Sequence, residues 1–286
     1  MARATRKESQ DYEAMASEKQ HQRLDRATFG GIVLALSGIV GGLLLEKGSI
    51  KDVAQFTAAL IVVGGTIGAL LVTTPWETLK LGVSHWKLIF FETQYAPGQL
   101  IEELITYSIK ARTKGLASLE LDATAVKDVF LRKALNLAAD NTGVAELKTT
   151  MELELDAFEH RSEEAARVYE SGGGYAPTVG IIGAVLGLIQ VMKNLANIEG
   201  VGHGIAVAFV ATVYGVGLAN LFLLPAAGKI RARSRMEVHR RELILNGVIG
   251  IVEGVNPRVL RNRLNAYLSE KQSKPSSRLG TASRAA

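Results

Sequence analysis

The sequence predicts an all-α integral membrane protein with four transmembrane helices and a helical cytoplasmic insert between the second and the third. Three observations predict this fold. Four stretches contain no Asp, Glu, Lys or Arg, and each is about 19 residues or longer, enough for a helix to cross a ~30 Å hydrocarbon core. A long charged segment separates these stretches into two pairs, and basic residues gather at their ends. The charge-free stretches are 27–45, 53–76, 171–192 and 204–228.

The order of charged and apolar segments predicts the domain organisation. No short apolar segment with a cleavage site follows the charged N-terminus, so no secretory signal is expected. The last residues are rich in Ser, Arg and Ala, a composition typical of disorder. The predicted domains are a charged cytoplasmic extension (1–26), spans one and two (27–76), a cytoplasmic helical domain (77–170), the pore-lining spans three and four (171–228), basic cytoplasmic helices (229–270) and a disordered tail (271–286).

Basic residues next to the span ends predict the orientation. Arg23 and Arg26 precede the first span, and a run of Lys229, Arg231, Arg233 and Arg235 follows the fourth. Because loops rich in Lys and Arg stay in the cytoplasm, both termini and the acidic segment 77–170 are expected inside. The short turns 46–52 and 193–203 are then outside. This topology also accounts for the formal net charge of +5 without nucleic acid as a partner.

The cytoplasmic insert has helical periodicity. Apolar residues recur at helical spacing in 98–113, 122–140 and 144–170, and the last of these helices runs toward the third span. Residues 229–268 have the pattern of one or two basic amphipathic helices.

A run of glycines stands at the start of the third span. Gly172, Gly173 and Gly174 are followed closely by Pro177. Glycine and proline both weaken helices, so this segment predicts a break or bend at the membrane surface.

Enzymatic and metal-binding motifs are not found. The chain has no cysteine, its five histidines lack metal-ligand spacing, and the glycine run is followed by Tyr175 where a phosphate-binding loop needs Lys and Ser or Thr. The sequence therefore predicts no catalysis, no cofactor and no metal.

The spans contain small residues four positions apart, which let helices approach closely. This pattern fits packing within one subunit and packing between subunits around an axis equally well. The pairs are Gly38 and Gly42, Gly64 and Gly68, Gly183 and Gly187, and Ala211 and Gly215.

The spans contain polar groups but no carboxylate. Hydroxyl groups in such helices usually bond to their own backbone, so each one alone favours a structural role. Charged side chains normally mark ion pathways in membranes. If the protein handles ions, the carboxylate that binds them must come from another subunit. The most polar positions are Ser37, Thr57, Thr66, Thr178, Thr212, Tyr214 and Asn220.

Four strings resemble the MotA/PomA flagellar stator family. They are YAPTVGIIGAVLGLI from Tyr175, ATVYG from Ala211, GGTIGALL from Gly64 and EGVNPR from Glu253, and the similarity extends over about residues 28–268. The resemblance implies a bacterial inner-membrane complex in which five such subunits surround a dimer of MotB, a single-span partner that supplies a pore Asp. It also implies that ion flow turns the ring of subunits and that the insert pushes on the rotor protein FliG.

The resemblance further implies roles for individual residues. The string KARTKGLASLE from Lys110 matches the family segment that contacts the rotor, which assigns this contact to Arg112 and Glu120. Pro177 and Pro225 match the two family prolines at the ends of the pore spans, and each is expected to bend its helix as the partner's Asp changes charge.

The same comparison bears on the ion. Sodium-type members have Thr where this chain has Ala184, whereas Thr212 is retained. Fewer oxygen ligands suit a proton better than a sodium ion, so protons are favoured. Thr178 and Tyr214 complete the residues expected at the pore.

Two other functions stay open from the sequence. TolQ and ExbB proteins share the two pore-lining spans and energise outer-membrane processes, but they typically have three spans and lack the insert. A membrane scaffold without ion flux is the third possibility.

Overall fold

The computed structural model describes residues 22–93, 96–193 and 195–268. Most of the predicted extension 1–26 and the whole predicted tail 271–286 lie outside these residues. The described chain is almost entirely helical, and four of its helices are long and apolar enough to cross a membrane. The all-α fold with four transmembrane helices is therefore confirmed.

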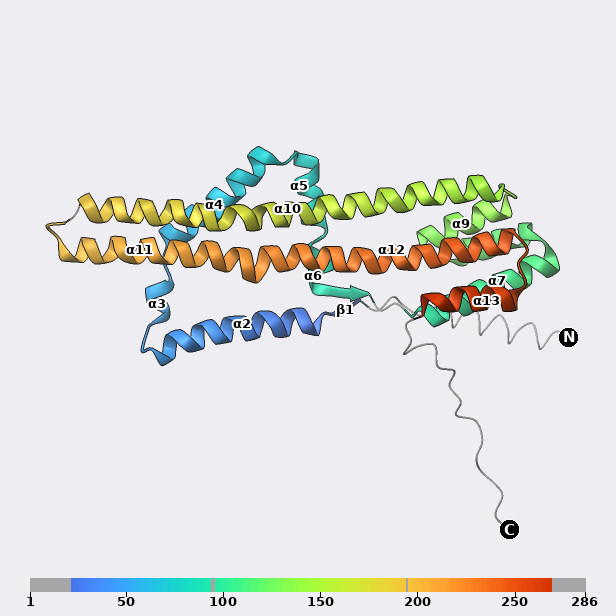
Figure 1. The fold of residues 1–286 in the computed structure, drawn as a ribbon, viewed down its shortest axis with the longest axis horizontal. Helices are drawn as coiled ribbons and strands as arrows, with labels where there is room; N and C mark the ends of the chain where they lie inside the picture. Colours follow the sequence, from blue (N-terminus) through green and yellow to red (C-terminus); the bar gives the residue numbers. More distant parts are fainter. Residues whose placement is uncertain (1–21, 94–95, 194, 269–286) are drawn as a thin grey trace, which may run out of the picture. The chain divides into compact units, whose positions relative to one another are not determined.

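The chain divides into two compact units. Residues 22–93 and 157–235 form one, which we call the span unit, and residues 96–156 and 236–268 form the other, which we call the head unit. Helices α10 (Val144–Lys193) and α12 (Leu224–Val252) are shared: each has one end in the span unit and the other end in the head unit (Figure 1). The predicted boundaries at 76 and 170 concern the edge of the bilayer and stay predictions.

The span unit contains the apolar helices. Its α4 packs against α11 through Ala58 and Val62 on one side and Val210 and Ala211 on the other. By contrast, α2 buries none of its side chains within the chain. The elements of this unit are β1 (Gln22–Leu24), α2 (Arg26–Leu45), α3 (Ile50–Val53), α4 (Phe56–Thr73), α5 (Trp76–Ser84), α6 (Trp86–Phe90), β2 (Phe91–Thr93), the later part of α10, α11 (Ile198–Gly217), a π-helical segment (Leu218–Leu223) and the start of α12.

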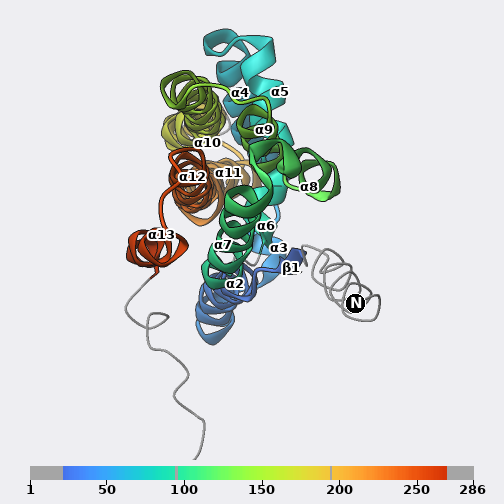
Figure 2. The same ribbon diagram turned by 90° about the vertical axis from the view of Figure 1, so that its right-hand side faces the viewer.

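The head unit has its own hydrophobic core. The buried residues of α7 are spaced three and four apart, as in Ile101, Leu104 and Ile105, and pack with α9, α10, α12 and α13. Figure 2 shows α7, α8 and α9 in this unit. Its elements are α7 (Pro97–Lys114), a 3₁₀ turn (Leu116–Ser118), α8 (Leu119–Ala125), α9 (Val129–Ala139), the first part of α10, the end of α12, α13 (Pro257–Leu264) and a second 3₁₀ turn (Asn265–Tyr267).

The structure contains a short antiparallel ribbon that the sequence did not predict. Three residues before the first span pair with three residues after α6, a length too short for an alternating pattern to reveal. The ribbon ties the start of α2 to the end of α6. The paired residues are Gln22 with Thr93, Arg23 with Glu92, and Leu24 with Phe91.

Of the break or bend predicted at the start of the third span, the break is wrong and the bend stays a prediction. Helix α10 runs without interruption through Gly172, Gly173 and Pro177. A proline removes one backbone hydrogen bond, which a long helix packed along its length tolerates. Gly173 serves close packing instead, because a Cβ atom there would lie 2.6 Å from the Leu224 side chain.

Two other boundaries differ from the predicted ones. The helix expected over 122–140 is two helices, since Asp128 starts a new one by accepting a hydrogen bond from the Leu131 N–H at 2.7 Å. In the fourth span the π-helical segment Leu218–Leu223 continues directly into α12, which contains Pro225 as its second residue.

Candidate functional site

The third and fourth spans pack against each other through backbone atoms. A Cβ atom on Gly180 would lie 2.9 Å from the Ala211 carbonyl oxygen, and one on Gly215 would lie 2.5 Å from the Ala176 carbonyl oxygen. Only glycine allows this approach, which is typical of close helix pairs in membranes. The two helices run side by side in Figure 1. The small residues Gly183, Gly187, Ala211 and Gly215 therefore pack within the subunit.

The small residues of the first two spans behave differently. Cβ atoms on Gly38, Gly42, Gly64 and Gly68 would meet no atom of the described chain within 4 Å. These glycines leave open surface on α2 and α4. That surface is available to lipid or to another subunit.

Pro177 and Thr212 lie on facing sides of the close helix pair. A Cβ atom on Gly215 would be 3.2 Å from the Pro177 Cα, and one on Gly180 would be 3.5 Å from the Thr212 Cα. The Thr212 hydroxyl is half-buried and donates to the Ala208 carbonyl at 3.3 Å. The structure thus brings these two predicted pore residues to one interface.

Thr178 and Ala184 lie elsewhere on α10. Thr178 is exposed, and its hydroxyl donates to the Tyr175 carbonyl at 2.7 Å. Ala184 is half-buried and offers no oxygen ligand. The hydroxyl groups of both threonines in the predicted pore set, Thr178 and Thr212, therefore donate to carbonyl groups of their own helices.

Tyr214 holds the start of the second span. Its hydroxyl donates to the Val53 carbonyl at 2.6 Å and accepts from the Gln55 N–H at 3.4 Å. Val53 ends α3 and Gln55 precedes α4, and the Gln55 N–H also donates to the Val53 carbonyl at 3.1 Å. Tyr214 therefore adds a side-chain anchor to the turn between α3 and α4.

Pro225 is exposed and stands one residue inside α12. The π-helical segment Leu218–Leu223 ends just before it. Segments of this kind are rare and occur often at functional sites.

The apolar parts of all four spans lack any charged side chain. Among the described residues, no group of three or more His, Cys, Asp or Glu is placed to hold a metal ion. The arrangement supplies close-packed helices with hydroxyl and carbonyl oxygens but no titrating acid. An ion path along these spans needs a carboxylate from another chain.

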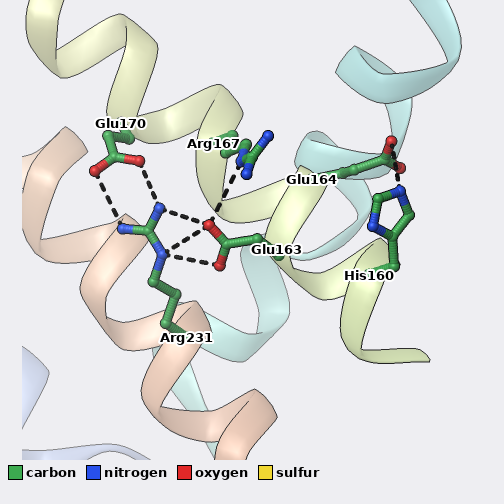
Figure 3. Close-up of polar contacts among 6 residues, drawn as sticks. All are labelled: His160, Glu163, Glu164, Arg167, Glu170 and Arg231. Carbon is green, nitrogen blue, oxygen red and sulfur yellow. Dashed lines mark hydrogen bonds and ion pairs between the residues drawn. The ribbon is translucent and has the colours of Figure 1, made fainter. Parts of the chain in front are cut away.

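A charged cluster follows the apolar parts of α10 and α12. Arg231 donates to Glu163 at 2.9 and 3.0 Å and to Glu170 at 2.5 and 3.2 Å (Figure 3). These hydrogen bonds hold the pKa values of both carboxyl groups below their ordinary value of 4.5. The sequence did not predict this cluster. Its one visible signal is the seven-residue spacing of Glu163 and Glu170, which puts both on one helix face.

A second charged cluster starts the first span. Asp25 is buried, caps α2 by accepting from the Ala27 and Thr28 N–H groups at 2.9 and 3.2 Å, and pairs with Lys229 and Arg233. Burial by itself raises the pKa of Asp25, but hydrogen bonds from Lys229, Thr28 and Arg233 outweigh it and hold the pKa well below its ordinary 3.8. The cluster fixes the start of α2 to α12.

Arg112 and Glu120 are both exposed in the head unit, on α7 and α8. Within the part of the chain that the structure describes, neither forms an ion pair. Lys110 on α7 binds Asp122 on α8 at 2.7 and 2.8 Å and so ties the two helices together. Gly115, with a φ of 84°, makes the turn between the two helices.

Comparison with known proteins identifies the family. Residues 122–243 match the MotA/TolQ/ExbB proton channel family. Motility protein A of Bacillus subtilis is 33% identical over 249 residues, which cover 87% of this chain and 92% of that protein. Chemotaxis protein PomA of Vibrio alginolyticus is 29% identical, over 86% of this chain and 96% of that protein.

Solved structures agree with the sequence comparison. The structure of C. jejuni MotAB matches with a TM-score of 0.83 and 30% identity, covering 88% of this chain and 99% of that one. The flagellar MotAB stator complex from Bacillus subtilis matches with a TM-score of 0.80 and 32% identity, covering 86% and 97%. The resemblance to flagellar stator subunits is confirmed, and this chain belongs to the MotA/TolQ/ExbB proton channel family, in its flagellar stator branch.

Proposed function

We propose that this chain forms the wall of the ion channel in a flagellar stator complex and that ion flow through this channel produces torque on the rotor. The observation that carries the proposal is the pair of close-packed, charge-free helices α10 and α11 in a chain whose relatives are motility proteins. Such helices can line a path but cannot bind a cation by a carboxylate of their own.

The missing carboxylate comes from a MotB-type partner with one span and a pore Asp. The solved relatives are complexes named MotAB, which supports this partner. Several copies of this chain, we propose five, surround a dimer of the partner in the bacterial cytoplasmic membrane. The open glycine surface on α2 and α4 is compatible with contacts to neighbouring copies and to lipid. Both termini lie in the cytoplasm.

Arg112 and Glu120 are the proposed contacts to the rotor protein FliG. Both side chains are exposed, and charged side chains on a surface bind a complementary charged partner rapidly. The ion pair between Lys110 and Asp122 supports this surface by fixing α8, which carries Glu120, to α7, which carries Arg112.

Protons are the proposed ion. Ala184 contributes no side-chain oxygen where sodium-type members have Thr, so of that pair of threonines only Thr212 is present. A proton needs only the partner's Asp and a path of water, whereas a sodium ion that sheds water needs several oxygen ligands. Pro177 and Pro225 are proposed to let the pore helices adjust as the partner's Asp gains and loses its proton.

The experiment compares a deletion strain with the same strain carrying this gene. The deletion should leave filaments assembled but not rotating, and the gene should restore rotation. In vesicles, this chain with its partner should conduct protons, and this chain alone should not. Loss of filaments, or conduction without the partner, would contradict the proposal. Swimming that stops without sodium but persists with a protonophore would overturn the choice of protons.

The rotor contact is tested by charge reversal. Arg112→Glu and Glu120→Lys should each reduce the torque of tethered cells while proton conduction persists. The matched control reverses Lys148 and Glu152, an exposed pair on α10 in the head unit. Equal effects of the test and control variants would remove the special role of Arg112 and Glu120. A TolQ/ExbB-like function predicts no effect on motility from any of these changes.

A further inference from the structure

The π-helical segment of the fourth span changes the backbone hydrogen bonds around Asn220. The Leu224 N–H donates to the Ala219 carbonyl, five residues back, instead of to the Asn220 carbonyl four residues back. The next residue is Pro225, which has no N–H to donate. The Asn220 carbonyl therefore loses both the donor that an α-helix provides and the donor that a π-helix provides.

An unpaired carbonyl is costly at this place. Asn220 lies inside the charge-free stretch 204–228, eight residues or about 12 Å along the helix from its C-terminal end. In the hydrocarbon core of a membrane each unsatisfied backbone group costs several kcal/mol. Irregular backbone is tolerated at that depth only where it lines a water-filled path or is buried in protein.

The side chain of Asn220 adds a second acceptor. It is exposed, and its Nδ2 donates to the Val216 carbonyl at 2.9 Å. The donor side of the amide is thus used by its own helix, which leaves Oδ1 as an acceptor. One residue presents two acceptor oxygens on the surface of the fourth span, with no charged group beside them in the apolar stretch.

Each hydroxyl residue below offers a single side-chain oxygen, whereas Asn220 adds to its Oδ1 a main-chain carbonyl that lacks its helical donor. The hydroxyls of Ser37, Thr66, Thr73, Thr178 and Thr212 each donate to a carbonyl three or four residues earlier on the same helix.

The other proline of the pore spans, Pro177, provides a contrast. Pro177 also removes a donor, from the Gly173 carbonyl, but Gly173 is buried against the Leu224 side chain. At that position a ligand has no access. Asn220 differs because its surface is open.

We propose that Asn220 is a water-binding site on the ion path, in which its main-chain carbonyl and its Oδ1 accept hydrogen bonds from water in the cytoplasmic half of the fourth span. This inference rests on the proposed function, because water bound at Asn220 relays the conducted proton between the partner's Asp and the cytoplasm. Water supplies the O–H donors that both oxygens lack. The absence of a negative charge keeps the site from holding a cation tightly, which passage requires.

The test uses the fact that the chain has no cysteine. Asn220→Cys is made in the complete complex with a cysteine-free partner, and Phe222→Cys is the control. Phe222 lies in the same π-helical segment, at nearly the same depth, and two residues away on a helix is close to the opposite face. Inside-out membrane vesicles are treated with a water-soluble, positively charged methanethiosulfonate and, separately, with silver ion.

Water at Asn220 predicts that Cys at 220 reacts roughly tenfold faster than Cys at 222, because thiolate formation needs an aqueous surrounding. Reaction at 220 should also block proton flux. Slow reaction at 220, or equal rates at both positions, would overturn the proposal. In either case a wild-type complex that conducts protons would leave the proposed function standing.

A second measurement applies if the cysteine variant fails to assemble. Asn220→Leu removes Oδ1, whereas Asn220→Gln keeps an amide acceptor. Proton flux through the leucine variant should fall roughly threefold or more, as expected for one lost hydrogen bond on the path, and the glutamine variant should keep most of its flux. Wild-type flux in the leucine variant would contradict the site.

Discussion

The guanidinium group of Arg231 on α12 binds the carboxylate of Glu163 on α10 through two parallel hydrogen bonds of 2.9 and 3.0 Å. Two-pronged pairs of this kind fix direction as well as distance. Glu170, two turns further along α10, holds the same guanidinium from the other side (Figure 3). Arg231 therefore fastens α10 and α12 together next to their apolar parts.

This geometry predicts a measurable coupling between Arg231 and Glu163. A double-mutant cycle with Arg231→Met and Glu163→Gln should give about 1 kcal/mol, at the upper end for partly exposed pairs. Thermal unfolding of the detergent-solubilised complex measures it. The same cycle at Lys80 and Glu77, whose side chains are 56% and 83% exposed, should give a value near zero. Equal couplings would show that the geometry of Arg231 is unimportant.

The same pair makes stability depend on pH. The pKa of Glu163 lies below its ordinary 4.5 because Arg231 hydrogen-bonds to the charged carboxylate. A lowered pKa in the folded state contributes stability that is fully present above 4.5 and is lost as the pH falls below it. The midpoint of thermal unfolding should therefore fall on acidification from about pH 5 to pH 3. The Glu163→Gln variant should have a smaller fall.

Asp25 should be among the most sensitive positions of the span unit. Its carboxylate is buried and pairs with both Lys229 and Arg233, so Asp25→Ala leaves two cations without their partner. A loss of about 3 kcal/mol of stability is expected. Asp25→Ser should recover about 1 kcal/mol of this, since serine still caps α2. If alanine and serine are equally destabilising, the cap contributes nothing.

Tyr214→Phe separates an anchoring role from a pore role. Loss of the hydroxyl removes the hydrogen bonds to the backbone of Val53 and Gln55, and should lower stability by about 1 kcal/mol. Proton flux and ion choice should stay unchanged. Tyr175→Phe is the control, because the Tyr175 hydroxyl has no hydrogen bond within the described residues. A change in ion choice with Tyr214→Phe would contradict a purely anchoring role and show that Tyr214 lies on the ion path.

Gly215→Ala should push α10 and α11 apart. The added Cβ would lie 2.5 Å from the Ala176 carbonyl oxygen, a backbone atom that cannot move by itself. Overpacking of this kind costs about 1–3 kcal/mol, and proton flux should fall with it. Gly217→Ala on the same helix meets no atom within 4 Å and should be neutral or slightly stabilising. Equal stability of the two variants would contradict close packing at Gly215.

The spans could be predicted from sequence because the rule behind them is local. A helix in hydrocarbon needs an unbroken run of uncharged residues, and the charge-free stretches meet that need wherever they lie in the fold. The helix interruption predicted at Gly173 and Pro177 is wrong because it depends on a contact that is not local. Whether glycine breaks a helix or allows a close neighbour depends on what packs against it, which here is Leu224.

The candidate site shows the same division. The absence of a carboxylate in the spans is visible in the sequence, and so is the match of Arg112 and Glu120 to a rotor-contacting segment. The partners of Asp25, Arg231 and Tyr214 are not, because each contact joins residues far apart along the chain, up to 208 positions in the case of Asp25 and Arg233.

The sequence by itself determined that this protein crosses the membrane four times and carries no acid there, since both follow from composition along short segments. Only the tertiary structure decided which helices touch, which charges pair and which backbone oxygen is left without a donor. The contacts depend on distances between segments, and the unpaired oxygen depends on how backbone hydrogen bonds are shared around Pro225. Composition along the chain reveals neither.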